Sequence, residues 1–482
     1  MKVFKNFLYN VFYQVLLMIL PLITAPYIAR TLGAEKIGIY YFTYSIAYYF
    51  VIFSQLGLSV YGNRSIASVR DSKEDLDRKF SELFKLQLIT STIFIVIYCG
   101  YVLLCNKYKI YFLIQFFYVI SALFDISWFY FGIEEFKKTV TKNSLVKICS
   151  VILILILVKK PEDLFIYCLI MSCSTLLGQL SLWINLKKYV CFKKIRIKDI
   201  KEHLKPTLIL FLPTIATSLY RVMDKIMLGS SVEITQLGLY ENSEKFIAIC
   251  MGVINALGTV MIPKISNLIS KGKDNEMMEY ISKSMEGIYI LAFAISFGLA
   301  GISNKLSLIF YGQEFSKCGL IILLLASSIL FSTWANVIRT QYLVPKEKDK
   351  EYIISMFCGA FINIVINMIF IKKLGAIGAA IGTIAAEMFV SLSHSYYVKN
   401  KLPLKKYIKT ICPYFFFGLI MFAVTKYIDL TLETKLISLI LEIVIGGFIY
   451  IVLIVLYTIR KKTQYYFIIK NFFDRKTKLK NI

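Results

Sequence analysis

Histidines, acidic residues and closely paired cysteines are scarce in this chain. Its 482 residues include two histidines, His203 and His394, and only 30 acidic residues against 56 lysines and arginines. Two separated histidines exclude a histidine-based metal centre and leave no catalytic triad to assemble. The ten cysteines form no C-x-x-C pair, so we expect free thiols packed as small apolar groups. The sequence therefore predicts neither a metal site nor a cofactor site.

Long polar stretches are also missing. Hydrophobic residues make up 57% of the chain and charged residues 18%, which excludes an ordinary soluble domain and predicts a polytopic membrane protein. The first apolar segment is too long for a signal-peptide core, so we interpret it as an uncleaved span. We expect an all-α fold with about 14 transmembrane helices, at roughly 7–30, 37–61, 82–104, 110–132, 143–158, 163–186, 206–228, 237–262, 285–303, 318–343, 352–371, 376–398, 408–425 and 436–459.

The basic residues alternate between the two sides of this predicted topology. Of the 56 lysines and arginines, 40 lie in the segments on one side and 11 in the short loops on the other. Because positive charge accumulates in cytoplasmic loops, both termini are predicted to be cytoplasmic. The net charge of +26 would suggest a nucleic-acid partner in a soluble protein, but topology explains it here, so we expect none.

An internal repeat divides the chain into two halves. Leu20-Pro21, Leu32-Gly33 and the run 37–40 recur as Leu212-Pro213, Leu228-Gly229 and the run 237–240. Six spans separate the copies, so both halves have the same orientation and are related by an axis along the membrane normal. We predict two six-helix lobes and two further helices, with an N-terminal lobe at 1–187, a cytoplasmic linker at 188–205, a C-terminal lobe at 206–398, spans 13 and 14 at 399–459 and a basic cytoplasmic tail at 460–482.

Charged residues occur inside two consecutive predicted spans. Arg221, Asp224 and Lys225 share one helical face, and Glu241, Glu244 and Lys245 repeat the pattern in the next span. A charge near the bilayer centre costs roughly 2.5–3.5 kcal/mol on insertion scales, so these side chains should face the protein interior or a hydrated cavity. Binding of an anionic substrate and simple pairing of the charges with one another are both open interpretations.

Four stretches resemble one known family. LPLITAPYIARTLGAEKIGIYYF, LGLSVYGNRSIASVRD, LFDISWFYFGIEEFK and LPTIATSLYRVMDKIMLG are similar to Wzx-type oligosaccharide flippases, which belong to the multidrug/oligosaccharidyl-lipid/polysaccharide (MOP) superfamily and are MATE-like in fold. The resemblance covers about residues 7–345. It implies two lobes around a central cavity, in a bacterial plasma-membrane protein that moves undecaprenyl-pyrophosphate-linked repeat units for capsule, O-antigen or exopolysaccharide assembly. The implied partners are this lipid-linked oligosaccharide, the bilayer, and the polysaccharide polymerase with other assembly proteins.

The predicted site residues follow from the chemistry of such a substrate. Its pyrophosphate needs cations, and the candidates are Arg30, Arg221, Lys225 and Lys245. The acidic residues in spans are interpreted as charge partners or coupling groups: Asp125, Asp224, Glu241, Glu244 and Glu387, of which Glu387 is a candidate proton carrier and equally a candidate for a hydrogen bond to a neighbouring helix. Arg64 and Arg339, at cytoplasmic span ends, either anchor their spans or attract the headgroup at the cavity entrance.

Other classes of protein are less consistent with this pattern. A membrane glycosyltransferase or polymerase needs a long loop or extramembrane domain for its acid and base groups, whereas the longest loops predicted here are short and basic. A multidrug antiporter of the same superfamily should carry acidic cavity residues for cationic drugs. A lipid II-type flippase also remains open. The mixed clusters with arginine and lysine favour an anionic substrate.

Overall fold

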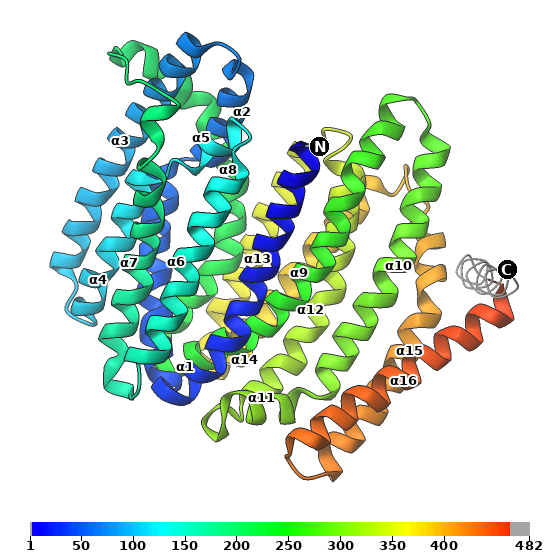
Figure 1. Cartoon of the computed structure of the whole chain (residues 1–482). Helices are drawn as coiled ribbons and strands as arrows, with labels where there is room; N and C mark the ends of the chain where they lie inside the picture. The colour runs from blue at the N-terminus through cyan, green and yellow to red at the C-terminus, as the bar shows by residue number, and fades with distance from the viewer. Residues whose placement is uncertain (1, 463–482) are drawn as a thin grey trace, which may run out of the picture. The chain divides into compact units, whose positions relative to one another are not determined.

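The computed structural model describes residues 2–462, without the side chains of 2–15, 17, 18, 220, 259 and 260. The predicted basic tail at 460–482 lies outside the described residues from 463 onward. All regular elements in the described part of the chain are helices, and it contains no β-strand (Figure 1). The elements are α1 (Lys2–Gln55), α2 (Leu58–Val69), α3 (Lys73–Leu104), α4 (Lys109–Phe124), α5 (Ser127–Gly132), α6 (Phe136–Leu157), η1 (Pro161–Asp163), α7 (Leu164–Trp183), η2 (Leu186–Lys188), α8 (Ile197–Ser231), α9 (Ile234–Ser270), α10 (Asp274–Gly301), α11 (Ser303–Tyr311), η3 (Gln313–Phe315), α12 (Cys318–Ile338), η4 (Arg339–Leu343), α13 (Asp349–Leu374), α14 (Ala376–Val398), α15 (Leu404–Thr431) and α16 (Leu436–Lys461).

The predicted all-helical, multi-span class is confirmed, but a count of 14 separate spans is not. Within the described residues, 12 helices are long and apolar enough to cross a membrane, or 13 if the bent pair Ile197–Leu219 and Arg221–Ser231 forms one span. The first two predicted spans form one continuous element, α1, which is broken at Gly33. Gly33 has φ +76° and ψ 169°, a conformation that glycine adopts without the steric cost other residues incur.

The chain forms two compact units. The first comprises the described residues of Met1–Lys245, Tyr311–Phe315 and Ile353–Ala386, and the second those of Phe246–Phe310, Ser316–Tyr352 and Glu387–Ile482. The lobe boundaries at 187 and 206 stay a prediction. The first unit contains the candidate site and is described first.

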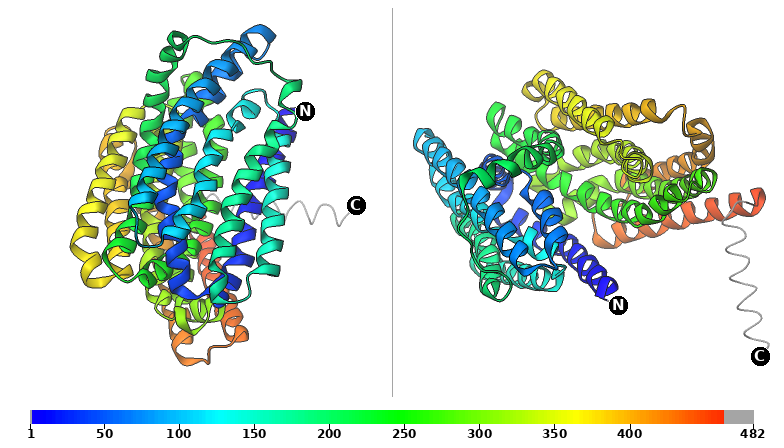
Figure 2. Two further views of the ribbon diagram at one scale, coloured as in Figure 1. Left: turned by 90° about the vertical axis from the view of Figure 1, so that its left-hand side faces the viewer. Right: turned by 90° about the horizontal axis from the view of Figure 1, so that it is seen from above.

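Aromatic side chains fill the interior of the first unit. In Figure 1, α3, α4, α6 and α7 run side by side, with α1 packed against α3, α4 and α6, and Figure 2 shows the same helices in two further directions. Tyr98 and Phe112 are buried where α1, α3 and α4 meet. Trp128 of α5 stacks on Phe80 of α3 and donates from its indole nitrogen to Gln87 Oε1 over 2.9 Å. These contacts fix the helices that surround the candidate site.

Two glycines related by the sequence repeat bring α1 and α9 into close contact. A Cβ atom on Gly38 would lie 2.1 Å from the carbonyl oxygen of Ile234, and one on Gly238 would lie 1.9 Å from that of Ala34. The sequence repeat has an offset of 200 residues, so Ala34 corresponds to Ile234 and Gly38 to Gly238. Each glycine therefore packs against the position that corresponds to the other glycine's partner. The repeat seen in the sequence is thus a pair of helices that approach each other through equivalent small residues.

The second unit joins α10, α12, α15 and α16. Its most buried ion pair is Lys305 with Glu442, whose side chains are 2% and 0% exposed. The Lys305 amide also donates to Asp429 Oδ1 over 3.1 Å, and Lys305 Nζ donates to the carbonyl oxygen of Ile428 over 2.8 Å. This network connects the start of α11 to α15 and α16.

Candidate functional site

A cavity of about 460 Å³ lies within the first unit. Helices α1, α4, α6, α7 and α9 form its walls. Its lining combines apolar residues with lysines, tyrosines, amides and hydroxyls, and contains no acidic residue among the described side chains. The polar and aromatic members are Thr24, Tyr41, Tyr44, Tyr118, Asn143, Lys147, Ser150, Tyr167, Ser174, Thr175, Gln179 and Lys245. Such a cavity suits a neutral or anionic polar ligand.

Two lysines supply the positive charge of the cavity. Lys245, on α9, donates from Nζ to Asn242 Oδ1 over 2.8 Å and lies 5.0 Å from the centroid of the Tyr41 ring. The side chain of Lys147, on α6, makes no hydrogen bond or ion pair with another described residue. A lysine in a membrane-spanning helix without a protein counter-charge is costly, and an anionic ligand would reduce that cost.

Tyrosine rings form a further part of the lining. Tyr44 and Tyr118 stack with centroids 5.0 Å apart, and the Tyr167 ring packs edge-on against Tyr40 at 4.8 Å. Gln179, on α7, has a buried Oε1 atom without a hydrogen-bond partner among the described residues. Ring faces with nearby amides and hydroxyls provide both apolar and hydrogen-bonding contacts for a sugar.

Four of the charges predicted on α8 and α9 come together beside this cavity. Lys225 Nζ lies 2.7 Å from Glu241 Oε2 and 3.1 Å from Glu244 Oε2. The ring centroid of Tyr41 is 5.9 Å from Lys225 Nζ and 5.0 Å from Lys245 Nζ. The formal charges of these two lysines and two glutamates sum to zero. Lys225 is paired with the two glutamates, whereas Lys245 lines the cavity.

Asp224 does not lie between Arg221 and Lys225, although their spacing suggested this arrangement. It is buried, and its carboxylate accepts hydrogen bonds from Asn367, Thr383 and Tyr240. Arg221 is exposed, and its side chain forms no hydrogen bond or ion pair with any other described residue. Successive helical residues are about 100° apart, so Asp224 lies about 60° around the helix from Arg221, enough to separate a buried from an exposed position.

The remaining predicted residues lie away from this cavity lining. Arg30 is exposed on α1, and Glu387 is half-buried on α14, where its carboxyl group makes no hydrogen bond or ion pair with other described residues. Asp125 follows α4 and accepts from Gln55 Nε2 at 2.8 Å and from the Ser127 amide at 3.0 Å. Those contacts make Asp125 a local cap of the α4–α5 joint.

The two arginines predicted at the entrance differ in their surroundings. Arg64 is exposed on α2. Arg339 begins the π-helical turn η4, donates to Asn336 Oδ1 over 3.0 Å and lies 5.6 Å from the ring centroid of Tyr352. Both positions are compatible with anchoring as well as with attraction of a headgroup.

The sequence analysis missed Lys147 as a cavity residue. The predicted span 143–158 contains Lys147, but the sequence analysis did not include it among the candidate site residues. The available signal was its place on α6, four residues after Asn143 and three before Ser150, which puts three polar side chains on one face of an apolar helix. The tyrosines were also missed individually, because 33 tyrosines offer no local criterion for choosing four.

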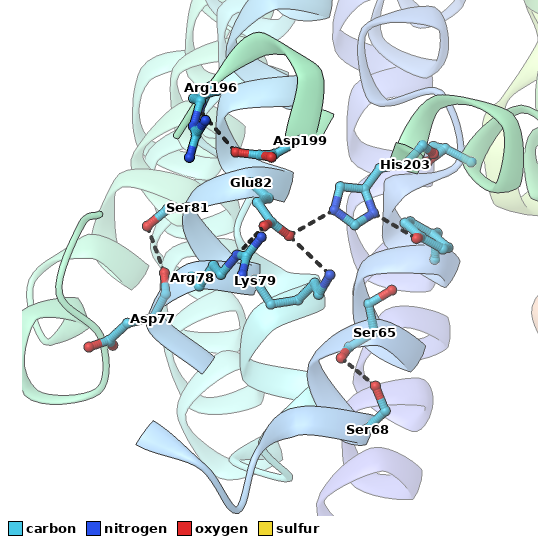
Figure 3. Close-up of polar contacts among 12 residues, drawn as sticks. Ser65, Ser68, Asp77, Arg78, Lys79, Ser81, Glu82, Arg196, Asp199 and His203 are labelled. Atoms are coloured by element: carbon cyan, nitrogen blue, oxygen red, sulfur yellow. Dashed lines mark hydrogen bonds and ion pairs between the residues drawn. The ribbon is translucent and has the colours of Figure 1, made fainter. Parts of the chain in front are cut away.

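A second polar cluster, around Glu82, involves the isolated His203 (Figure 3). Glu82 of α3 is 3% exposed and lies 2.9 Å from both Arg78 and His203 and 3.0 Å from Lys79. The other ring nitrogen of His203 contacts the Tyr61 hydroxyl at 2.8 Å. This cluster attaches the first turns of α8 to α2 and α3.

The predicted linker 188–205 is docked on α3. It is non-helical through 190–196, and α8 then begins at Ile197. The Cys191 amide donates to Asp77 Oδ1, and the Lys193 amide to Ser81 Oγ, both over 2.9 Å. Lys85 donates to the carbonyl oxygen of Ile195 over 2.6 Å.

The fold and the cavity define a class: a multi-pass membrane transporter with a cationic cavity between helices. A family model described as "Polysaccharide biosynthesis protein" matches residues 3–269, more than half of the chain. The chain therefore belongs to the polysaccharide biosynthesis protein family, as the quoted stretches predicted.

Relatives agree with this assignment, and solved structures share the fold. A protein assigned as an O-antigen transporter in Shigella dysenteriae is 25% identical over 384 residues, covering 77% of this chain and 94% of the relative. A protein with the same assignment in Escherichia coli (strain K12) is 23% identical over 401 residues, covering 82% of this chain and 96% of the relative. The solved structure of the lipid II flippase MurJ in an inward closed conformation has a TM-score of 0.76 at 17% identity and covers 94% of this chain and 99% of its own. The solved structure of an inward-facing MATE multidrug transporter of the MOP superfamily has a TM-score of 0.58 at 13% identity. It covers 88% of this chain and 96% of its own. These likenesses show the MOP fold, and none of these proteins is an enzyme by name.

Proposed function

We propose that this protein is a flippase that moves lipid-linked oligosaccharide repeat units across the bacterial plasma membrane. The observation that carries the proposal is the cavity of the first unit, which presents Lys147 and Lys245 among tyrosines, amides and hydroxyls. The relatives named as O-antigen transporters support the same substrate class. The fold, the family and the lining of the cavity thus point to one activity.

The chemistry of the substrate explains this lining. An undecaprenyl-pyrophosphate-linked glycan has an anionic head, a polar sugar and an apolar tail. The head and sugar cannot cross hydrocarbon alone, because polar groups lose their hydrogen bonds to water there. The lysines give the phosphates point charges, the tyrosines and amides contact sugars, and the tail remains in lipid. Arg30 and Arg221 are proposed as further contacts for the anionic head, and Lys225 as a support for Lys245 through the Tyr41 ring that both lysines approach. Arg64 and Arg339 are proposed entrance residues.

A multidrug antiporter is the second candidate, since MATE transporters share the fold. Cationic drugs require acidic groups in the binding cavity, and the described lining of this cavity has none. We therefore favour the anionic substrate. Polysaccharide polymerase and other assembly proteins are proposed partners.

Loss of the protein tests the activity. A strain lacking the gene should accumulate lipid-linked oligosaccharide on the cytoplasmic leaflet and lose its surface polysaccharide. Reintroducing the wild-type gene should reverse both effects. Accumulation on the outer leaflet instead would identify a later step, such as polymerisation, and would contradict the proposal.

We further propose that both termini and the linker 188–205 are cytoplasmic, which follows from the bias of basic residues. A reporter enzyme that is active only in the cytoplasm should therefore be active when fused after Lys205. A fusion after Lys160, in a predicted outer loop, is the matched control and should be inactive. The reverse pair of activities would overturn the topology.

A further inference from the structure

The first turns of α8 carry an exposed groove of about 350 Å³. All of its lining residues come from this one helix, and none of them lines the cavity that contains Lys147 and Lys245. They are Lys201, Leu204, Lys205, Leu208, Ile209 and Leu212. Positions 201, 205, 208 and 212 recur at the spacing of one helical face, so the two lysines and the apolar residues form a continuous stripe.

The opposite face of α8 holds the helix in place. His203, Thr207 and Phe211 are 5%, 0% and 3% exposed, on the side of α8 that packs against α1, α2 and α3. Figure 3 shows His203 pointing toward Glu82 of α3, which it contacts at 2.9 Å. The apolar residues of the groove are 40–53% exposed: Leu204, Leu208, Ile209 and Leu212. The groove is therefore the outer face of a docked helix.

The two lysines of the groove have no carboxylate that neutralises them. The side chains of Lys201 and Lys205 are exposed and make no hydrogen bond or ion pair with another described residue. Glu202, which lies between them in sequence, is also exposed and pairs with neither. Two cations one helical turn apart favour an anion beside them, and a lysine offers phosphate a point charge.

The polar and apolar parts of the stripe follow the order of groups in a phospholipid. Lys205 directly precedes the predicted span 206–228, which places the lysines at the level of the lipid headgroups. The stripe continues from Lys205 to Leu212 over about 10 Å, at a rise of about 1.5 Å per residue. One leaflet contributes about 15 Å of hydrocarbon, so an acyl chain is long enough to cover the apolar part.

We propose that this groove binds one anionic phospholipid, with its phosphate at Lys201 and Lys205 and an acyl chain along Leu208 and Leu212. A zwitterionic headgroup brings its own cation close to the two lysines and therefore binds less well. The undecaprenyl tail of the proposed substrate is far longer than the stripe, whereas a phospholipid chain matches it. The bound lipid anchors the start of α8 at the membrane surface, independently of which substrate is transported.

The test is native mass spectrometry of the purified full-length protein in detergent. Phosphatidylglycerol and phosphatidylcholine with identical acyl chains are titrated separately. A lysine near an anionic lipid surface strengthens binding about fivefold, so two lysines predict that the first phosphatidylglycerol binds about 25-fold more tightly than phosphatidylcholine. Equal affinities for the two lipids would overturn the proposal.

A pair of double variants assigns this preference to the groove. Lys201→Gln/Lys205→Gln should bring the affinity for phosphatidylglycerol to within about threefold of that for phosphatidylcholine. Lys194→Gln/Lys198→Gln removes the same charge from exposed lysines that do not line the groove, and it should keep the wild-type preference. An equal loss of preference in both double variants would show a general attraction to basic residues and would contradict the site.

Two further outcomes would assign the groove to another occupant. Undecaprenyl pyrophosphate is titrated in the same way, and the mass spectra also report the oligomeric state. If undecaprenyl pyrophosphate bound through Lys201 and Lys205 and phosphatidylglycerol did not, the groove would belong to the substrate. If Lys201→Gln/Lys205→Gln converted a dimer to a monomer, it would belong to a second copy of the chain. Either result would overturn the proposal.

Discussion

Export of surface polysaccharide should fall at least tenfold when Lys147 is replaced by glutamate. The substitution places a negative charge against the anionic head of the substrate, and like charges brought together cost several kcal/mol, where each 1.4 kcal/mol is about a factor of ten. Lys245→Glu should have the same effect, because Lys245 lines the same cavity from α9. The measurement is surface polysaccharide per unit of membrane-inserted protein, with the protein level determined by immunoblotting.

Lys137→Glu is the matched control for this prediction. Lys137 lies on the same helix, α6, is exposed and does not line the cavity. It should retain export close to the wild-type level. If Lys137→Glu and Lys147→Glu reduced export equally, the effect would come from the overall charge of α6, and the cavity would lose its support.

The Lys225→Met variant should lose about 3–5 kcal/mol of stability, as expected when one partner of a buried ion pair is removed. The Lys225 side chain is 16% exposed and faces Glu241 and Glu244, which are 8% and 29% exposed. Without the lysine, two carboxylates face each other without compensation. Lower abundance in the membrane and a lower unfolding midpoint in detergent are the expected results.

A second substitution and a control separate charge from packing. Glu241→Gln added to Lys225→Met should recover much of the loss, because the most buried negative charge is then removed. Lys36→Met breaks an exposed pair with Glu35 at 3.8 Å and should change stability by no more than about 0.5 kcal/mol. No recovery in the double variant would mean that Lys225 acts through its packing.

The fold could be predicted largely from the sequence because membrane insertion depends on local properties. Apolar length defines the helices, and the repeated glycines at 38 and 238 mark the crossing of α1 and α9. The number of separate spans could not be fixed. Whether the chain breaks at a residue such as Gly33 depends on contacts from distant segments, here Glu314 of η3, whose Oε1 accepts from the Ala34 amide over 2.8 Å.

The candidate site could be predicted only where its residues are close in sequence. Helical spacing singled out the charges on α8 and α9, and Lys225 pairs with Glu241 and Glu244 because these two helices are consecutive. Asn367 and Thr383, which donate hydrogen bonds to Asp224, lie on α13 and α14, more than 130 residues away, and no local pattern connects them to it. Lys147 was missed as a cavity residue for a related reason. Counting charges assigns a lysine to a loop or to a span, but its side chain faces a cavity only through packing.

The most direct test of the account is photocrosslinking of the substrate from inside the cavity. Met171 lines the cavity on α7, whereas Leu177, on the same helix, is 58% exposed and does not. Each is replaced in turn by benzoylphenylalanine in cells that make radiolabelled lipid-linked oligosaccharide, and only variants that restore export are irradiated. The account predicts a labelled adduct at position 171 and little or none at 177. An export-competent variant with no adduct at 171, or with equal labelling at both positions, would contradict the claim that this cavity holds the head of the substrate.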